Sequence, residues 1–123
     1  MNNQDSNIDN FYSLKSIDYP NLVRLSIFQK FVLPGDPPVI DIELELSHKD
    51  LRQPQMLLLT FKGVTNFKFT QPLASHLQII QIDITSIKDW HWENARYKVT
   101  EVEDNLFTLM CKEFSARLKT NTE

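Results

Sequence analysis

The sequence predicts an all-β fold, either an antiparallel β-sandwich or one strongly curved sheet of about seven to eight strands. Segments with alternating apolar and polar residues recur along the chain and are separated by turn-forming residues. After Leu14, no long stretch carries the 3.6-residue period of an amphipathic helix. Hydrophobic residues make up 41% and charged residues 24% of the chain, so a single globular domain over residues 1–123 is expected.

Both ends of this domain are expected to be frayed, over residues 1–7 and 118–123, because their polar residues bury little against the entropy lost on ordering. The whole segment Ser115–Glu123 is interpreted as a ragged tail. Between Ile8 and Leu14, the apolar residues are compatible with one short helical turn or with a strand that docks on the sheet. The first twenty residues contain three aspartates and no continuous apolar core, so no secretory signal is predicted.

Two strands with contrasting faces are predicted next. Leu22–Leu33 alternates in a way that suits a long strand, with some apolar residues on its second face. The proline-rich run at residues 34–38 ends this strand, because proline fixes φ and lacks an amide donor. Val39–Leu46 follows as the cleanest amphipathic strand, with isoleucine and leucine on one face and carboxylates on the other.

The middle of the chain continues the strand pattern. Gln55–Lys62 has an apolar centre, which predicts a strand covered on both faces. Gly63 suits a bulge or tight bend before the alternating segment Val64–Thr70. His76–Ile87 is predicted as a strand because a helix would scatter its β-branched residues, and Lys88–Asn94 carries two tryptophans at strand spacing.

A β-hairpin is predicted within Ala95–Phe114. A connection of odd length places Val99 opposite Leu109 and Tyr97 opposite Cys111, so that the apolar residues of both strands share one face. A two-residue turn would set the two apolar patterns against each other. The odd connection is therefore predicted.

No catalytic residue, metal site or cofactor is predicted. The three histidines and the single cysteine do not fall at a recognised metal-ligand spacing. The sequence also lacks a glycine-rich phosphate loop and a nucleophile elbow. We interpret two histidines as surface-loop residues, one as a neighbour of the tryptophans, and the cysteine as a core residue whose burial raises its pKa. These residues are His48, His76, His91 and Cys111.

The charge and cysteine content limit the classes of partner. The formal net charge of −3 is well mixed along the chain, so no nucleic-acid partner is expected. The longest apolar runs are much shorter than a bilayer span, so no membrane partner is expected. One cysteine cannot form an intrachain disulfide, which favours the reducing cytoplasm. The edges of hairpins are able to pair between chains, so a homodimer is compatible with the sequence.

Asp41, Glu43 and Glu45 are the candidate partner-binding residues. They share one face of the predicted strand Val39–Leu46. The ordinary explanation is that this face of an antiparallel sheet is solvated. The functional alternative is an acidic docking surface for a basic protein, because like charges about 7 Å apart along a strand steer association.

Trp90, Trp92 and Tyr97 offer an alternative site, an aromatic platform for a small ligand or a carbohydrate. Residues two apart on a strand point the same way, so the two indoles should be buried together or exposed together. Their aromatic bulk favours burial over the platform.

A resemblance to a known family is carried by two segments, LTFKGVTNFKF at Leu59–Phe69 and ARYKVTEVEDNLFTLMCKEF at Ala95–Phe114. Their strand pattern resembles small all-β bacterial immunity proteins of polymorphic toxin systems, over roughly the C-terminal half of the chain. The resemblance implies a cytoplasmic, non-enzymatic protein that binds and neutralises a cognate toxin, and it assigns no toxin-contacting residue. The paired tryptophans and the proline-rich loop have no counterpart in it. We therefore expect a protein-interaction domain, with a small-ligand or carbohydrate-binding module as the alternative.

Overall fold

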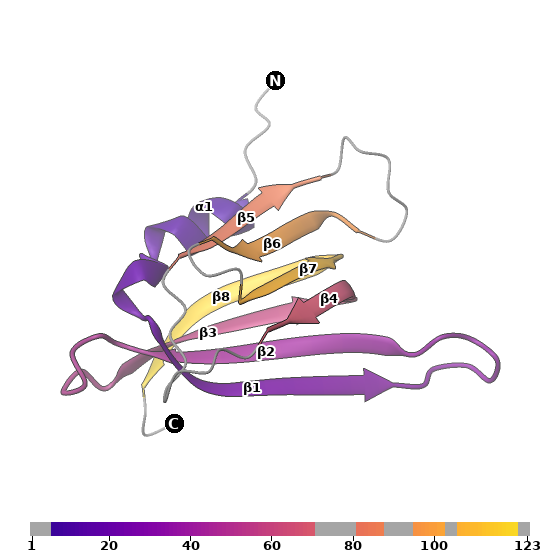
Figure 1. The fold of residues 1–123 in the computed structure, drawn as a ribbon, viewed down its shortest axis with the longest axis horizontal. Helices are drawn as coiled ribbons and strands as arrows, with labels where there is room; N and C mark the ends of the chain where they lie inside the picture. Colours follow the sequence, from indigo (N-terminus) through magenta and orange to yellow (C-terminus); the bar gives the residue numbers. More distant parts are fainter. Residues whose placement is uncertain (1–5, 71–80, 88–94, 103–105, 121–123) are drawn as a thin grey trace.

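The computed structural model describes residues 6–70, 81–87, 95–102 and 106–120, and over these it shows strands in two sheets with one short helix (Figure 1). The elements are α1 (Ser6–Ser13), the 3-10 turn η1 (Ser16–Asp18), β1 (Asn21–Lys30), β2 (Val39–Ser47), β3 (Gln55–Lys62), β4 (Thr65–Phe69), β5 (Ile82–Ser86), β6 (Tyr97–Glu101), β7 (Phe107–Cys111) and β8 (Glu113–Thr120). Sheet A has the strand order β1-β2-β3-β8, and sheet B has the order β4-β7-β6-β5. All pairings are antiparallel, which confirms the predicted all-β fold.

The two sheets are joined where two neighbouring segments cross from one to the other. Gly63 and Val64 carry the chain from β3 to β4, and Lys112 carries it from β7 to β8. The backbone N–H of Lys112 donates to the carbonyl oxygen of Lys62 at 2.9 Å, so the two crossings lie side by side. The ladder between β3 and β8 stops here, and the ladder between β4 and β7 resumes just beyond. Sheets A and B are therefore two halves of one antiparallel ladder that folds at this corner.

Gly63 makes the corner possible, and the predicted tight bend is confirmed there. Its φ is +65°, in the left-handed region that glycine adopts without a Cβ clash. A Cβ at this position would lie 3.0 Å from Cγ of Lys112. The Gly63 N–H donates to Oδ1 of Asp41 at 3.2 Å, which ties the corner to β2.

The β6–β7 hairpin has the predicted register. Tyr97 lies opposite Cys111 and Val99 lies opposite Leu109, and all four side chains are buried. Residues 102–106 form the connection, which has the expected odd length. The end of the connection at Leu106 is held by the buried Glu101 of β6. The Glu101 Oε1 accepts a hydrogen bond from the Leu106 N–H at 3.1 Å.

The core lies between the two sheets and is closed on one side by α1. Phe11 of α1 is 1% exposed and belongs to the same cluster as the inward side chains of both sheets. Asn10 donates from Nδ2 to the Ala116 carbonyl oxygen at 2.8 Å, so α1 is fastened to β8. Of the two alternatives for this segment, the structure shows the helix.

The C-terminal segment differs from the sequence prediction. Ser115–Glu123, including residues 118–120, was expected to be a tail, but Glu113–Thr120 forms β8 and pairs with β3 along its whole length. This expectation was wrong because the ordering entropy is offset by a full ladder of hydrogen bonds to a strand that is distant in sequence. Frayed residues were also expected over 1–7, but Ser6 and Asn7 belong to α1.

Part of the predicted strand at His76–Ile87 is present as β5. Residues 71–80 lie outside the described residues. Lys88–Asn94, with Trp90 and Trp92, also lies outside them.

We expect Gly63→Ala to lower the free energy of unfolding by about 2 kcal/mol, because it adds left-handed backbone strain and displaces Lys112. The matched control is Gly35→Ala, where φ is +88° but no atom lies within 4 Å of the added Cβ. We expect about 1 kcal/mol for the control. Urea unfolding measures both values, and equal losses would show that close packing at the corner adds nothing.

Candidate functional site

The face of sheet A that points away from sheet B carries most of the charged groups that the sequence singled out. Ile42, Leu44 and Leu46 of β2 are buried in the core, so the residues between them point outward. Strand register assigns neighbours to them from the other three strands. The outer face of sheet A is formed by Arg24, Ser26, Phe28 and Lys30 of β1, Asp41, Glu43 and Glu45 of β2, Leu58, Thr60 and Lys62 of β3, and Glu113, Ser115, Arg117 and Lys119 of β8.

Glu45 is held by cations of its own sheet. It is 7% exposed, although carboxylates are seldom buried unless they are paired. Its Oε2 lies 3.4 Å from Nε of Arg24 on β1, and its Oε1 forms an ion pair with Nζ of Lys119 on β8. Lys119 reaches across β3 to make this contact, so Glu45 links three strands of the sheet.

Asp41 is also engaged within the chain. Its Oδ1 accepts the Gly63 N–H, and its Oδ2 lies 3.8 Å from Nζ of Lys30. The carboxylate side chain is 16% exposed, whereas the Lys30 side chain is 67% exposed. The main structural role of Asp41 is therefore to hold the corner between the two sheets.

Glu43 is the predicted carboxylate that stays available to an external group. It lies between Ser26 of β1 and Thr60 of β3, both uncharged. Within the described residues, neither an ion pair nor a hydrogen bond engages its side chain. It lines a shallow depression of about 240 Å³ on the outer face of sheet A. The other residues of this depression are Phe28, Lys30, Asp41, Thr60 and Lys62.

The outer face of sheet A carries both signs of charge. The carboxylates of β2 form one row, and lysines and arginines lie on the strands to either side. The row is therefore partly neutralised, and its electrostatic pattern is a set of alternating local charges. Such a pattern distinguishes between partners by position as well as by net charge.

Tyr97 cannot belong to the alternative aromatic platform, because its side chain is buried. Tyr97 is 4% exposed, and its ring packs edge-on against Phe114 with centroids 4.8 Å apart and an interplanar angle of 89°. A ring in this position belongs to the core and cannot stack on a ligand. Trp90 and Trp92, the other two members, lie outside the described residues.

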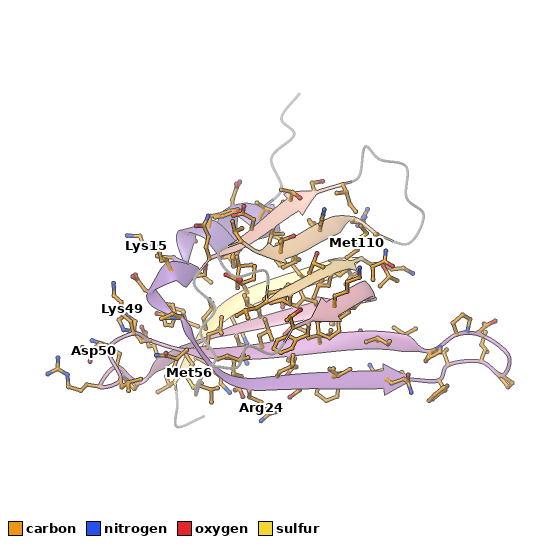
Figure 2. All side chains as sticks on the ribbon, viewed as in Figure 1. Lys15, Arg24, Lys49, Asp50, Met56 and Met110 are labelled. Carbon is orange, nitrogen blue, oxygen red and sulfur yellow. The ribbon has the colours of Figure 1, made fainter. Side chains whose placement is uncertain are left out.

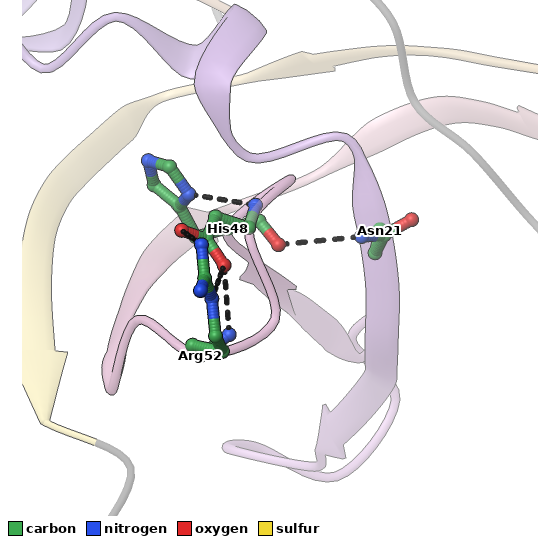
Figure 3. A network of polar contacts seen from close by, with 4 residues as sticks. Asn21, His48 and Arg52 are labelled. Carbon is green, nitrogen blue, oxygen red and sulfur yellow. Dashed lines mark hydrogen bonds and ion pairs between the residues drawn. The ribbon is translucent and has the colours of Figure 1, made fainter.

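His48 takes part in a loop network and not in a cluster of metal ligands (Figure 3). Its Nδ1 accepts the Asp50 N–H at 2.9 Å, and its carbonyl oxygen accepts Nδ2 of Asn21 at 3.4 Å. The imidazole packs edge-on against Tyr19, with centroids 5.1 Å apart. Hydrogen bonds from Arg52 to the Asp50 carboxylate lower the pKa of Asp50 and complete the network. These contacts fix the turn between β2 and β3.

Cys111 has the core position that the sequence predicted. The side chain is fully buried, and burial raises the pKa of the thiol to about 12. A thiol with this pKa is protonated at neutral pH and cannot act as a nucleophile or a metal ligand. Among the residues that the structure describes, no group of three potential ligands could hold a metal ion. His76 and His91 fall outside that part of the chain.

Sequence reasoning missed the basic residues of β8, Arg117 and Lys119. The signal was present, since Phe114, Ala116 and Leu118 alternate with polar residues along Glu113–Thr120. The segment lacked a visible partner strand, because β3 and β8 are separated in sequence by the whole of sheet B.

The fold and the site define an all-β protein that presents a mixed-charge sheet face. Residues 3–117 match the family model described as immunity protein PIM8, and the chain belongs to this family. The resemblance to immunity proteins of toxin systems is confirmed and extends to the N-terminal half. No curated protein and no solved structure matches the chain. No helix in the described residues is long and apolar enough to cross a membrane.

We expect Lys119→Met to lower the free energy of unfolding by about 2 kcal/mol, because it removes one of two cations from the buried Glu45. The control is Lys30→Met, which removes an exposed lysine 3.8 Å from Asp41 and should change stability by less than about 0.5 kcal/mol. Chemical denaturation of both variants measures the difference. If Lys119→Met left the free energy of unfolding unchanged, Arg24 alone would suffice to compensate the charge of Glu45.

The buried thiol of Cys111 makes stability depend on alkaline pH. Because folding raises the pKa from 9.0 to about 12, the folded state favours the protonated thiol. Its contribution is complete below pH 9 and is lost as the pH rises towards 12, with a slope approaching about 1.4 kcal/mol per pH unit.

The test compares urea unfolding of the wild type with Cys111→Ala, which lacks the titrating group, from pH 8 upward. The wild type should lose stability relative to the variant above pH 9, and a thiol reagent should label Cys111 only after unfolding. Parallel pH profiles with rapid labelling of the native protein would contradict a buried thiol.

Proposed function

We propose that this protein binds a cognate toxin and neutralises it as a non-enzymatic partner in the cytoplasm. The observation that carries the proposal is the family match over residues 3–117, since immunity proteins act on toxins. The uncharged thiol of Cys111, buried and unpaired by a disulfide, is in keeping with a reducing compartment.

We propose further that the toxin binds to the outer face of sheet A, with Glu43 as the main acidic contact. Asp41 and Glu45 are engaged by their own sheet, whereas Glu43 faces the depression without a cation of its own within the described residues. A lysine or arginine of the toxin that reached Glu43 would gain a charge-assisted hydrogen bond. The side chains around it lie on hydrogen-bonded strands, so little ordering entropy would be lost on binding.

Reversing the charges of Asp41 and Glu43 together would be a direct test of the acidic docking surface that the sequence predicts. The structure favours a single change, because Asp41 also accepts the Gly63 N–H and its replacement would disturb the corner. Glu43→Lys reverses one charge in the depression and leaves the corner intact. Asp9→Lys is the matched control, since it makes the same charge change at an exposed position of α1, outside the outer face of sheet A.

We expect Glu43→Lys to weaken toxin binding at least tenfold and to leave the melting temperature within a few degrees, because it places a cation where the toxin presents one. Asp9→Lys should bind as the wild type does. Each protein serves as bait in a lysate of the producing cell, and mass spectrometry identifies what the wild type and the control retain but Glu43→Lys loses.

The captured protein is then expressed alone in a sensitive host. It should arrest growth, and co-expression of the wild type should relieve the arrest whereas Glu43→Lys should not. A captured protein that is harmless to the host would refute the immunity function. Full rescue by Glu43→Lys would refute this surface and leave the function standing.

A further inference from the structure

The two sheets have four edge strands. Within the described residues, three of these edges are protected from pairing with another molecule. At the β5 edge, the Tyr12 hydroxyl accepts the Ile84 N–H at 3.2 Å and donates to the Ile84 carbonyl oxygen at 3.5 Å. At the β8 edge, Nδ2 of Asn10 donates a hydrogen bond to the Ala116 carbonyl oxygen. The β4 edge is short and interrupted by a register shift, with Asn66 at a φ of +53°. Bulges and covering side chains of this kind prevent strand pairing between molecules.

The β1 edge is long and open by comparison. β1 lies at the end of sheet A and, with β2, runs past the end of sheet B (Figure 1). In the described part of the chain, no hydrogen bond from outside the sheet reaches the backbone of residues 22–30. β1 has a register shift of its own between Leu22 and Arg24, near its start, and pairs regularly with β2 from Arg24 to Lys30. A regular stretch with an unpaired row of N–H and C=O groups is a template for another strand.

Exposed apolar side chains concentrate along this edge and the turn that follows it. Figure 2 draws the side chains on the ribbon, with Arg24 of β1 labelled. Seven of the eleven large hydrophobic side chains exposed in the described residues lie between positions 23 and 39. Phe31 is 73%, Val32 is 67% and Ile27 is 55% exposed. The group is completed by Val23, Phe28, Leu33 and Val39. A cluster of this kind is unusual for a surface that faces only water.

Charge and apolar pairing identify a second copy of β1 as a fitting occupant. Two copies related by a twofold axis pair antiparallel, with one residue lying opposite its own equivalent. An axis at Ile27 would place Arg24 opposite Lys30 of the other copy, and like charges in that position repel. An axis at Phe28 instead places Phe28 opposite itself and Leu25 opposite Phe31, and it leaves both cations opposite uncharged residues.

An axis at Ser26 also avoids the repulsion. It places Phe31 opposite Asn21, the first residue of β1, and leaves Val32 beyond the paired segment, although these two are the most exposed members of the apolar group. The axis at Phe28 brings both Phe31 and Val32 into the paired segment, with Val32 opposite Arg24. The Phe28 register therefore covers more of the apolar surface without a charge conflict.

We propose that the β1 edge pairs with β1 of a second copy, antiparallel about a twofold axis at Phe28, so that two sheets A become one continuous sheet. This inference is independent of the proposed toxin binding. Edge pairing leaves the outer faces of both sheets A open, with Glu43 one strand away from the new junction.

The first test measures mass by sedimentation of the purified chain. The wild type should sediment as a species of twice the 14.4 kDa chain mass at high concentration. Phe28→Lys and Phe28→Glu should each be monomeric, because each places like charges opposite each other, and an equimolar mixture of the two should regain the dimer. Leu51→Lys, a similar change at a residue 77% exposed in the β2–β3 turn, should remain dimeric. A monomeric wild type, or a mixture that does not associate, would overturn the proposal.

The second test fixes the register and does not depend on the charged variants folding. Phe28→Cys should form a disulfide-linked dimer on mild oxidation, because directly opposed residues have Cα atoms about 5 Å apart. Ser26→Cys is the control, since its equivalent lies about 13 Å away in this register. The buried Cys111 is present in both and should not react. Cross-linking of Ser26→Cys but not of Phe28→Cys would refute the axis at Phe28.

Discussion

The hydrogen bond between Lys112 and Lys62 at the corner is the contact on which the rest of the structure depends. It brings the two crossings of the chain together, so that one antiparallel ladder serves both sheets. Gly63 permits the sharp turn, and Asp41 binds its N–H from the neighbouring strand. Once the ladder is folded here, the inward faces of β2, β3, β6 and β7 meet, and the burial of their apolar side chains stabilises the sandwich.

The same corner shapes the candidate site. It occupies Asp41, while the pairing of β8 with β3 brings Lys119 to Glu45. Two of the three carboxylates on β2 are therefore engaged by their own sheet, and within the described residues Glu43 has no ion pair. A row of acidic residues on a strand is thus not equivalent to an acidic surface, because the neighbouring strands decide which charges are compensated.

The helix α1 gives the edges of the sheets different properties. Its Tyr12 and Asn10 satisfy backbone groups on β5 and β8, which lie at the ends of different sheets. One short helix thereby blunts two edges at once and leaves β1 open. The exposed apolar residues of β1 fit this asymmetry, since a strand that is to be paired needs side chains that gain from burial.

The sequence by itself determined the elements whose information is local. Alternation placed the long strands, Gly63 marked the bend, and the requirement that apolar residues share one face set the register of Tyr97 and Cys111. The three carboxylates were correctly placed on one face for the same reason. Only the tertiary structure decided that residues 113–120 form a strand, because their alternation is short and the partner strand β3 is remote in sequence. It also decided which carboxylate and which edge have no partner among the described residues, since both depend on strand order, and strand order is fixed by contacts between distant segments.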